Sequence, residues 1–474
     1  MKNYSSYSEI RRDLHSGEIT CQQLVRYHLE NIGRHGELNA FLEVFDEEAL
    51  LRAEEVQEKI TNGTAGKLAG LVVGIKDVLA YENHELTAAS KILEGFKSQF
   101  TATAVKKLIA EDAIIIGRQN CDEFAMGSSN ENSAYAKVVN GIGANLVPGG
   151  SSGGSAVAVQ MDMCRISLGT DTGGSVRQPA AFCGVVGLKP TYSRISRYGL
   201  AAYASSFDTI GVFSKCVEDV ALTLEVIAGK DEFDSTVSSR DVPAYTKKLS
   251  EKKKYKIAYF DECLKGIGVS PEVVSVVQGL LDRLKEEGHT VEKSTFTMMD
   301  YLLPTYYILT TAEASSNLSR YDGVKFGQRT ENATSLEEMY KNTRNEGFGD
   351  EVKRRIMLGT FVLSASYFDA FYTKAQKARR LIKEQTEQIL AEYDFVVLPT
   401  TPSPAFEIES VKDSIEMYLS DLYTVQASVS GIPAISIPVG ENSEGLPIGV
   451  QIMSAHFSEE KLLAFSHQIL SEKN

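Results

Sequence analysis

Short apolar runs that alternate with longer helical stretches constrain the fold of this chain more than any other feature. Each run has five or six residues and most are rich in valine and isoleucine. Runs of this length are typical of buried strands, and the stretches between them are long enough for helices. The pattern predicts an α/β fold, with a mixed β-sheet covered on both faces by helices. The runs are LVVGI (71–75), AIIIG (113–117), KIAYF (256–260), FVVLP (395–399), AISIP (434–438) and IGVQIM (448–453).

The first 62 residues have a different pattern, which predicts a helical N-terminal segment packed on the core. Ser6 with Glu9, and Thr20 with Gln23, have the spacing of capping boxes at helix starts. Apolar residues then repeat at helical spacing at Ala49, Ala53, Val56 and Ile60. No long linker rich in proline or serine divides the remainder. We therefore expect residues 63–474 to form one large domain on which residues 1–62 pack.

Composition excludes several classes of function. The formal net charge of −14 argues against a broad nucleic-acid-binding face, because such faces are rich in lysine and arginine. No apolar stretch is long enough to span a membrane, and the N-terminus lacks the apolar segment of a signal peptide. The six cysteines and seven histidines lack the spacing of metal ligands. The sequence predicts a cytoplasmic protein with free thiols, no membrane contact and no metal.

Two clusters of glycine and serine lie between Pro148 and Pro190. Glycine lets backbone N–H groups approach a substrate closely, so both clusters suit an anion or oxyanion site. Neither cluster supplies the lysine of a phosphate-binding P-loop, which argues against a nucleotide site. The first cluster also fits the G-x-S-x-G nucleophile elbow around Ser151, which requires a later histidine. The candidates for that histidine are His289, His456 and His467.

A lysine at the end of the first apolar run adds a third element. Serine is a weak nucleophile unless a base takes its proton, and a lysine serves as that base only when it is neutral. Burial among apolar neighbours lowers the pKa of a lysine. Lys76 follows LVVGI directly, so burial is expected there. Together Lys76, Ser151 and Ser175 form a candidate catalytic set.

With these elements the chain resembles the amidase signature family. The motif GGSSGGS (149–155), then DTGGSVRQP (171–179) and an upstream lysine match its pattern, and Ser151 and Ser175 have its separation of 24 residues. The resemblance implies that Ser175 is the nucleophile, that Ser151 is a bridging serine after a cis peptide bond, and that Lys76 is the base. The implied oxyanion hole comprises the N–H groups of Thr172, Gly173, Gly174 and Ser175. We interpret Asp171 and Arg177, on either side of the nucleophile, as a structural ion pair.

Stretches outside the catalytic motifs narrow the resemblance to the A subunits of glutamyl-tRNA(Gln) amidotransferases. They are residues 122–135, 187–211, 312–327 and 347–379. Such subunits are glutaminases, and an amino acid is recognised by its charged ends. The resemblance implies that Arg355 binds the α-carboxylate, with the adjacent Arg354 as the alternative. It also implies that Asp421 pairs with the α-ammonium group and that Tyr306 lines the pocket.

The resemblance further implies partners. The chain is expected to form a heterotrimer with B and C subunits, and its glutamine-derived ammonia would convert Glu-tRNA(Gln) to Gln-tRNA(Gln). This chain itself would hold no cofactor, whereas the B subunit would use ATP and magnesium and would hold most of the charged tRNA. The alternative function is a stand-alone amidase for small aliphatic or aryl amides.

Overall fold

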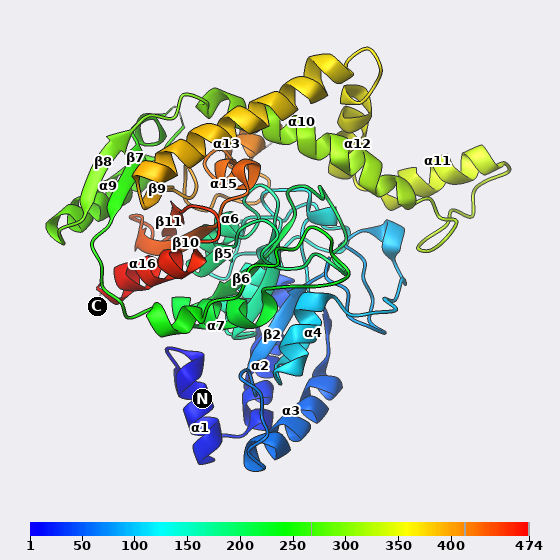
Figure 1. Cartoon of the computed structure of the whole chain (residues 1–474). Coiled ribbons are helices and arrows are strands. Elements are labelled where there is room, and N and C mark those ends of the chain that lie inside the picture. The colour runs from blue at the N-terminus through cyan, green and yellow to red at the C-terminus, as the bar shows by residue number, and fades with distance from the viewer. Residues whose placement is uncertain (267, 412–413, 473–474) are drawn as a thin grey trace.

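The computed structural model describes residues 1–266, 268–411 and 414–472, and its centre is an 11-stranded sheet (Figure 1). The strand order is β1-β3-β2-β4-β6-β5-β10-β11-β9-β7-β8. All six apolar runs singled out in the sequence are strands of this sheet. The strands are β1 (Phe41–Val44), β2 (Val72–Lys76), β3 (Ile114–Gln119), β4 (Ile166–Asp171), β5 (Val186–Lys189), β6 (Thr209–Ser214), β7 (Lys256–Phe260), β8 (Thr290–Ser294), β9 (Phe395–Pro399), β10 (Ala434–Glu441) and β11 (Pro447–Met453).

The sheet is mixed, as predicted. Strand β2 pairs in parallel with both β3 and β4, and β7 pairs in parallel with both β8 and β9. The pairs between β4 and β9, through β6, β5, β10 and β11, are antiparallel. The predicted α/β architecture is confirmed.

Helices cover both faces of the sheet (Figure 1). Helices α5 and α6 pack together against the strands on one face, whereas α7 and α16 pack together on the other. The longer helices α12 and α13 both pack on α10 at one end of the molecule. The helices are α1 (Tyr7–Ser16), α2 (Cys21–Arg34), α3 (Asp46–Thr61), α4 (Thr103–Ala110), α5 (Gly153–Gln160), α6 (Arg177–Cys183), α7 (Val217–Ile227), α8 (Glu262–Lys265), α9 (Pro271–Glu286), α10 (Met299–Asn317), α11 (Leu336–Gly347), α12 (Asp350–Val362), α13 (Lys374–Glu392), α14 (Ser414–Leu419), α15 (Val425–Ser430) and α16 (Glu459–Ser471).

The N-terminal segment contains the three helices α1 to α3, and it also contains a strand that the helical prediction missed. Strand β1 pairs antiparallel with β3, because β3 would otherwise leave its backbone groups unpaired at the sheet edge. Of the two predicted capping boxes, that of Thr20 and Gln23 is present. The other is wrong: the Ser6 hydroxyl pairs with Ser8, and the Glu9 carboxylate accepts from the N–H of Ser5. The domain division at residue 62 stays a prediction.

Candidate active site

The parallel pairing of β2 with β4 brings the candidate residues to one edge of the sheet. Neighbouring parallel strands end at the same edge, and ligands of α/β sheets bind beyond such carboxyl ends. Lys76 is the last residue of β2, and Asp171 is the last residue of β4. The loop before α5 carries Ser151, and the turn between β4 and α6 carries Ser175. Segments distant in sequence therefore meet here.

Lys76 is completely buried, and its amine is surrounded by hydroxyl groups. Its Nζ lies 2.8 Å from Ser151 Oγ, 2.9 Å from Ser152 Oγ and 2.9 Å from Thr170 Oγ1. Burial lowers the pKa of Lys76 to about 8, although nearby acidic groups, including Asp122, act in the opposite direction. At pH 7 a lysine with this pKa is neutral in about a tenth of the molecules, against less than about a thousandth for an ordinary lysine. It has both the position and the charge state of a base.

Ser151 follows a cis peptide bond from Gly150, as the family resemblance implied. The N–H of Gly150 donates to Gln178 Oε1 at 2.9 Å, and the carbonyl of Ser151 accepts from the N–H of Asp122 at 3.1 Å. A Cβ atom at position 150 would lie 2.1 Å from Asp122 Oδ2, so only glycine fits there. The Asp122 carboxylate is itself held by the N–H of Asn130 at 3.0 Å. These contacts orient the Ser151 hydroxyl toward Lys76.

The turn that carries Ser175 is shaped by two glycines. Gly174 has a φ of 150°, and a Cβ atom at Gly173 would lie 2.4 Å from the ring of Tyr306. Both positions therefore require glycine, and Tyr306 lies directly against the turn. Ser175 is 9% exposed, whereas Lys76 and Ser151 are completely buried. Among the described residues, hydrogen bonds join Ser151 to Lys76 but not to Ser175.

Asp171 and Arg177 form the predicted structural ion pair. Both side chains are completely buried, and two guanidinium nitrogens donate to the carboxylate at 3.1 and 2.9 Å. Arg177 also donates to the carbonyl of Thr424 at 2.6 Å and to Gln451 Oε1 at 2.9 Å. The pair anchors both ends of the turn that holds Ser175.

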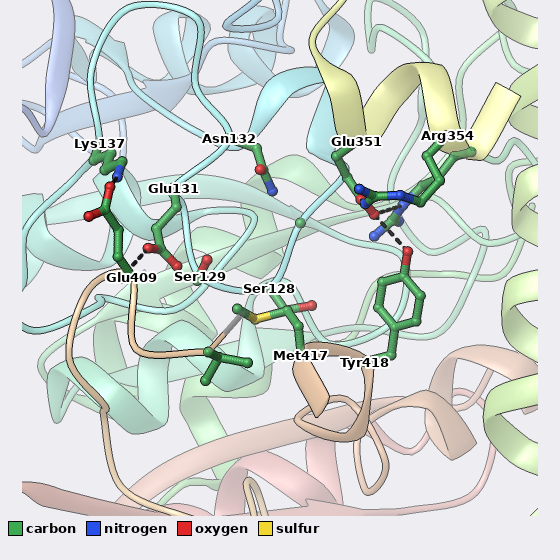
Figure 2. Close-up of a pocket in the computed structure, with 13 residues that line it drawn as sticks. Ser128, Ser129, Glu131, Asn132, Lys137, Glu351, Arg354, Glu409, Met417 and Tyr418 are labelled. Carbon is green, nitrogen blue, oxygen red and sulfur yellow. Dashed lines mark hydrogen bonds and ion pairs between the residues drawn. The ribbon is translucent and has the colours of Figure 1, made fainter. Parts of the chain in front are cut away.

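A pocket of about 500 Å³ opens between the 127–137 loop, α12 and the chain before and within α14 (Figure 2). Arg354 and Arg355 both line it. Arg355 is 3% exposed and points inward, whereas the side chain of Arg354 is 53% exposed, and both arginines form an ion pair with Glu351. Helix α12 therefore buries the side chain of Arg355 and exposes that of Arg354. The sequence alone left this choice open.

The buried guanidinium of Arg355 lies among aromatic rings. It donates to the hydroxyl of Tyr203 at 2.9 Å and to Glu351 Oε1 at 2.8 Å. The rings of Tyr203, Tyr307 and Tyr418 lie 5.4 to 5.6 Å from its central carbon. Arginine stacks on such faces, which fixes the plane of its donors.

Asp421 shares a neighbour with Arg355, because the Tyr307 hydroxyl donates to its carboxylate and the Tyr307 ring faces the Arg355 guanidinium. Its Oδ2 accepts from Ser128 Oγ at 2.8 Å and from the Tyr307 hydroxyl at 2.9 Å. Burial raises the pKa of Asp421 to about 6, so the carboxylate is largely ionised at neutral pH. Its carbonyl accepts from the hydroxyl of Thr424, the residue that a Cβ atom at Gly174 would strike. The position of Asp421 is therefore coupled to the turn of Ser175.

Sequence reasoning missed several residues of this site. Ser152 and Thr170 contact Lys76, and Ser152 had a signal because it belongs to the GGSSGGS motif. No sequence signal marked Tyr203, Tyr307 or Glu351, because these residues come from separate segments that only folding brings together. No group of three or more His, Cys, Asp or Glu side chains suited to a metal ion occurs in the described parts of the chain. No described helix is both long and apolar enough to cross a membrane.

Comparison with known proteins gives a consistent result over almost the whole chain. The family model described as Amidase matches residues 23–463. The A subunit of the glutamyl-tRNA(Gln) amidotransferase from Chlorobium phaeobacteroides (strain BS1) is 48% identical over 474 residues, which cover 98% of each chain. The protein of the same description from Chlorobium chlorochromatii (strain CaD3) is 49% identical over 469 residues, covering 98% of this chain and 99% of its own.

A solved structure agrees with these relatives. The crystal structure of the A subunit of the glutamyl-tRNA(Gln) amidotransferase from Thermotoga maritima has a TM-score of 0.77 and 38% sequence identity. The match covers 94% of this chain and 90% of that one. Similarity therefore extends well beyond the two glycine-rich motifs.

Proposed function

Because the chain belongs to the amidase family, and within it to the A subunits of glutamyl-tRNA(Gln) amidotransferases, we propose that it hydrolyses glutamine with Ser175 as nucleophile. The ammonia released would pass to another subunit of the complex and convert Glu-tRNA(Gln) to Gln-tRNA(Gln). The observation that carries this proposal is the buried amine of Lys76, 2.8 Å from Ser151 Oγ at the sheet edge where the turn of Ser175 lies.

The proposed reaction proceeds through an acyl-enzyme. Ser175 Oγ attacks the amide carbon of glutamine while its proton passes through Ser151 to the neutral Lys76. The N–H groups of Thr172, Gly173, Gly174 and Ser175 would stabilise the oxyanion, because backbone donors fixed in a turn need no rearrangement as its charge develops. Lys76 then returns the proton through Ser151 to the leaving nitrogen, and ammonia departs. Water hydrolyses the resulting ester by the same proton route in reverse.

Two oppositely charged side chains suit the ends of a free amino acid. We assign the α-carboxylate to Arg355 and the α-ammonium group to Asp421, with Tyr306 against the turn that binds the amide. The inward position of Arg355 supports this choice over Arg354. Ion pairs to both charged ends would favour glutamine over a neutral amide, because a neutral amide has no charged end to form them.

Replacing Arg355 by lysine is expected to raise the KM for glutamine about 10- to 100-fold, because lysine keeps the charge but cannot present a planar two-donor fork. The matched control is Arg354→Lys, on the adjacent residue of the same helix, for which we expect a change of less than about threefold. Steady-state glutaminase assays with thermal melts of both variants measure this. A larger effect at Arg354 would assign the carboxylate to that residue instead.

The proposal includes partners that the names of the relatives suggest. As an A subunit, the chain would assemble with B and C subunits in a heterotrimer, with ATP, magnesium and most of the charged tRNA on the B subunit. The net charge of −14 supports this division of labour, since RNA binds basic surfaces. We place the complex in the cytoplasm, where charged tRNA is used.

The test of the function is a comparison of two substrates. The chain is co-purified with its native partner subunits, and ammonia release from glutamine and from propionamide is assayed with and without Glu-tRNA(Gln) and ATP. We expect glutamine to be the preferred substrate and the tRNA to become amidated. A preference for propionamide, with no amidation, would favour the stand-alone amidase.

A further inference from the structure

Asp208 is a buried carboxyl group that the proposed reaction does not use. It is 3% exposed, and in the described part of the chain its carboxyl oxygens contact only hydroxyl and N–H donors, with no lysine or arginine in an ion pair. Burial raises the pKa of Asp208 to about 7, although hydrogen bonds from Ala204 and Thr172 act in the opposite direction. A carboxyl group in this setting costs stability. The reason for its position therefore lies in its contacts with the active site.

The register between β4 and β6 places Asp208 beside the turn of Ser175. Asp171, the last residue of β4, pairs with Thr209, the first residue of β6. In an antiparallel pair, the residue that follows one strand lies opposite the residue that precedes the other. Thr172 and Asp208 are these two residues, and the Thr172 hydroxyl donates to Asp208 Oδ1 at 2.9 Å. Asp208 is thereby joined to the first residue of the proposed oxyanion hole.

The second carboxyl oxygen of Asp208 binds the segment that reaches Arg355. Asp208 Oδ2 accepts from the N–H of Tyr203 at 3.0 Å and from the N–H of Ala204 at 3.1 Å. The hydroxyl of Tyr203 in turn accepts from Arg355 Nη1 at 2.9 Å. One carboxyl group therefore joins the turn that would bind the amide carbonyl of glutamine to the arginine that would bind its α-carboxylate.

The residue before Asp208 supports the same turn. The ring of Phe207 lies 5.9 Å from the ring of Tyr306 and meets it edge to face, and Tyr306 lies directly against Gly173. The two ends of glutamine are separated by a fixed number of bonds, so the oxyanion turn and Arg355 must be held at a matching separation. A displacement of about 1 Å in such an arrangement can lower a rate about 100-fold.

We propose that Asp208 is a positioning residue for glutamine hydrolysis, which holds the oxyanion turn through Thr172 and the carboxylate-binding Arg355 through Tyr203. It touches neither the substrate nor the reacting atoms and acts only through these neighbours. This inference rests on the proposed function. It adds one group that fixes the two ends of the substrate site relative to each other.

The first test replaces Asp208 by alanine in the complex purified with its native partner subunits. The change removes both connections, so we expect kcat for glutamine to fall about 30-fold or more and KM to rise about fivefold. Asp208→Asn can still accept from the N–H of Tyr203 and contact the Thr172 hydroxyl, and it should retain at least about ten times the kcat of Asp208→Ala. Steady-state glutaminase assays with thermal melts measure this.

The matched control is Asp219→Ala, which removes another buried carboxyl group. Asp219 is also 3% exposed; it accepts from the N–H of Tyr7 at 2.8 Å and pairs with Arg165, at the opposite end of β4 from Ser175. Its loss should lower the unfolding temperature. Both kcat and KM should stay within about twofold of the wild type, because distant sites act independently.

The second test separates the two connections at Thr172. Thr172→Val keeps the shape and the backbone N–H but removes the hydroxyl that donates to Asp208. We expect kcat to fall about tenfold with a much smaller change in KM, because Tyr203 stays bound to Asp208. Thr172→Ser keeps the hydroxyl and should have a clearly higher kcat than Thr172→Val. Adding Thr172→Val to Asp208→Ala should lower kcat by less than about threefold more, since both changes remove the same contact.

Three results would overturn the inference and leave the function of Ser175 intact. They are a wild-type kcat in Asp208→Ala, an equal kcat in the two Thr172 variants, and a loss in Asp219→Ala as large as that in Asp208→Ala. If Asp208→Ala does not fold, the comparison of Thr172→Val with Thr172→Ser decides. If the wild-type complex hydrolyses no glutamine, the proposed function itself fails.

Discussion

Replacement of Ser175 by alanine is expected to lower glutamine hydrolysis by about four to six orders of magnitude. The variant keeps the oxyanion turn and the substrate contacts but has no atom that can form the acyl-enzyme, and losing a nucleophile has effects of this size. The fold should be unaffected, because Ser175 packs at the edge of the site and the adjacent Asp171 and Arg177 stay paired. Ammonia release by the complex, with a thermal melt of each variant, measures the effect.

The matched control is Ser155→Ala, a buried serine from the first glycine-rich cluster. Its hydroxyl donates to Gln119 Oε1 at 2.9 Å, away from the Lys76 amine, so activity should stay within a few-fold of the wild type. Mass spectrometry of acid-quenched enzyme should locate the glutamyl ester on the peptide that contains Ser175. An ester on Ser151 would contradict this and would favour the nucleophile-elbow interpretation.

Replacement of Lys76 by methionine is expected to lower kcat at least about 1,000-fold, because it removes the only amine that contacts Ser151 among the described residues. Methionine has a similar length and fits an apolar environment, which limits the effect on packing. Three hydroxyl groups lose their common partner, so a thermal melt accompanies the assay. Near wild-type activity in this variant would exclude Lys76 as the base.

The pH dependence of the wild type tests the same residue. Burial favours the neutral form of Lys76 and brings its pKa down to about 8, and only the neutral form accepts a proton. Below that pH the protonated fraction grows, so kcat/KM should fall about tenfold per pH unit; above it, kcat/KM should level off. Thr170→Val removes one hydrogen-bond acceptor that stabilises the protonated amine of Lys76. The midpoint of the pH profile of kcat/KM should therefore move to lower pH in this variant. A profile flat between pH 6 and 9 would contradict the assignment.

The strands that the sequence predicted are mostly buried, but burial alone did not make a strand predictable, because β4, β5 and β6 are buried along their whole length and were not predicted. FVVLP and AISIP were predicted because they are short, apolar and end at a proline, which is consistent with a buried strand and too short for a typical helix. Strand β1 was missed because its reason lies outside its own residues, in the open edge of β3. The capping box at Ser6 failed for a similar reason, since Ser8 supplies a nearer partner for its hydroxyl.

The residues of the candidate site likewise fall into those that the sequence predicted and those that it missed. Lys76, Ser151 and Ser175 were found because the chemistry requires glycine at neighbouring positions, and glycine-rich motifs are visible in a sequence. No motif of this kind surrounds Glu351, Tyr203 or Tyr307, and tyrosine and glutamate occur throughout the chain. The choice between Arg354 and Arg355 depended on the rotation of α12, which is set by its packing on α10.

The sequence by itself determined the α/β class, the catalytic motifs and the family, because each depends on residues that are close together along the chain. Only the tertiary structure decided that the Lys76 amine lies against Ser151, Ser152 and Thr170, and that Arg355 points inward. These features depend on how separate strands and helices pack. A pKa near 8 for a lysine, in particular, follows from burial, which is a property of the whole fold.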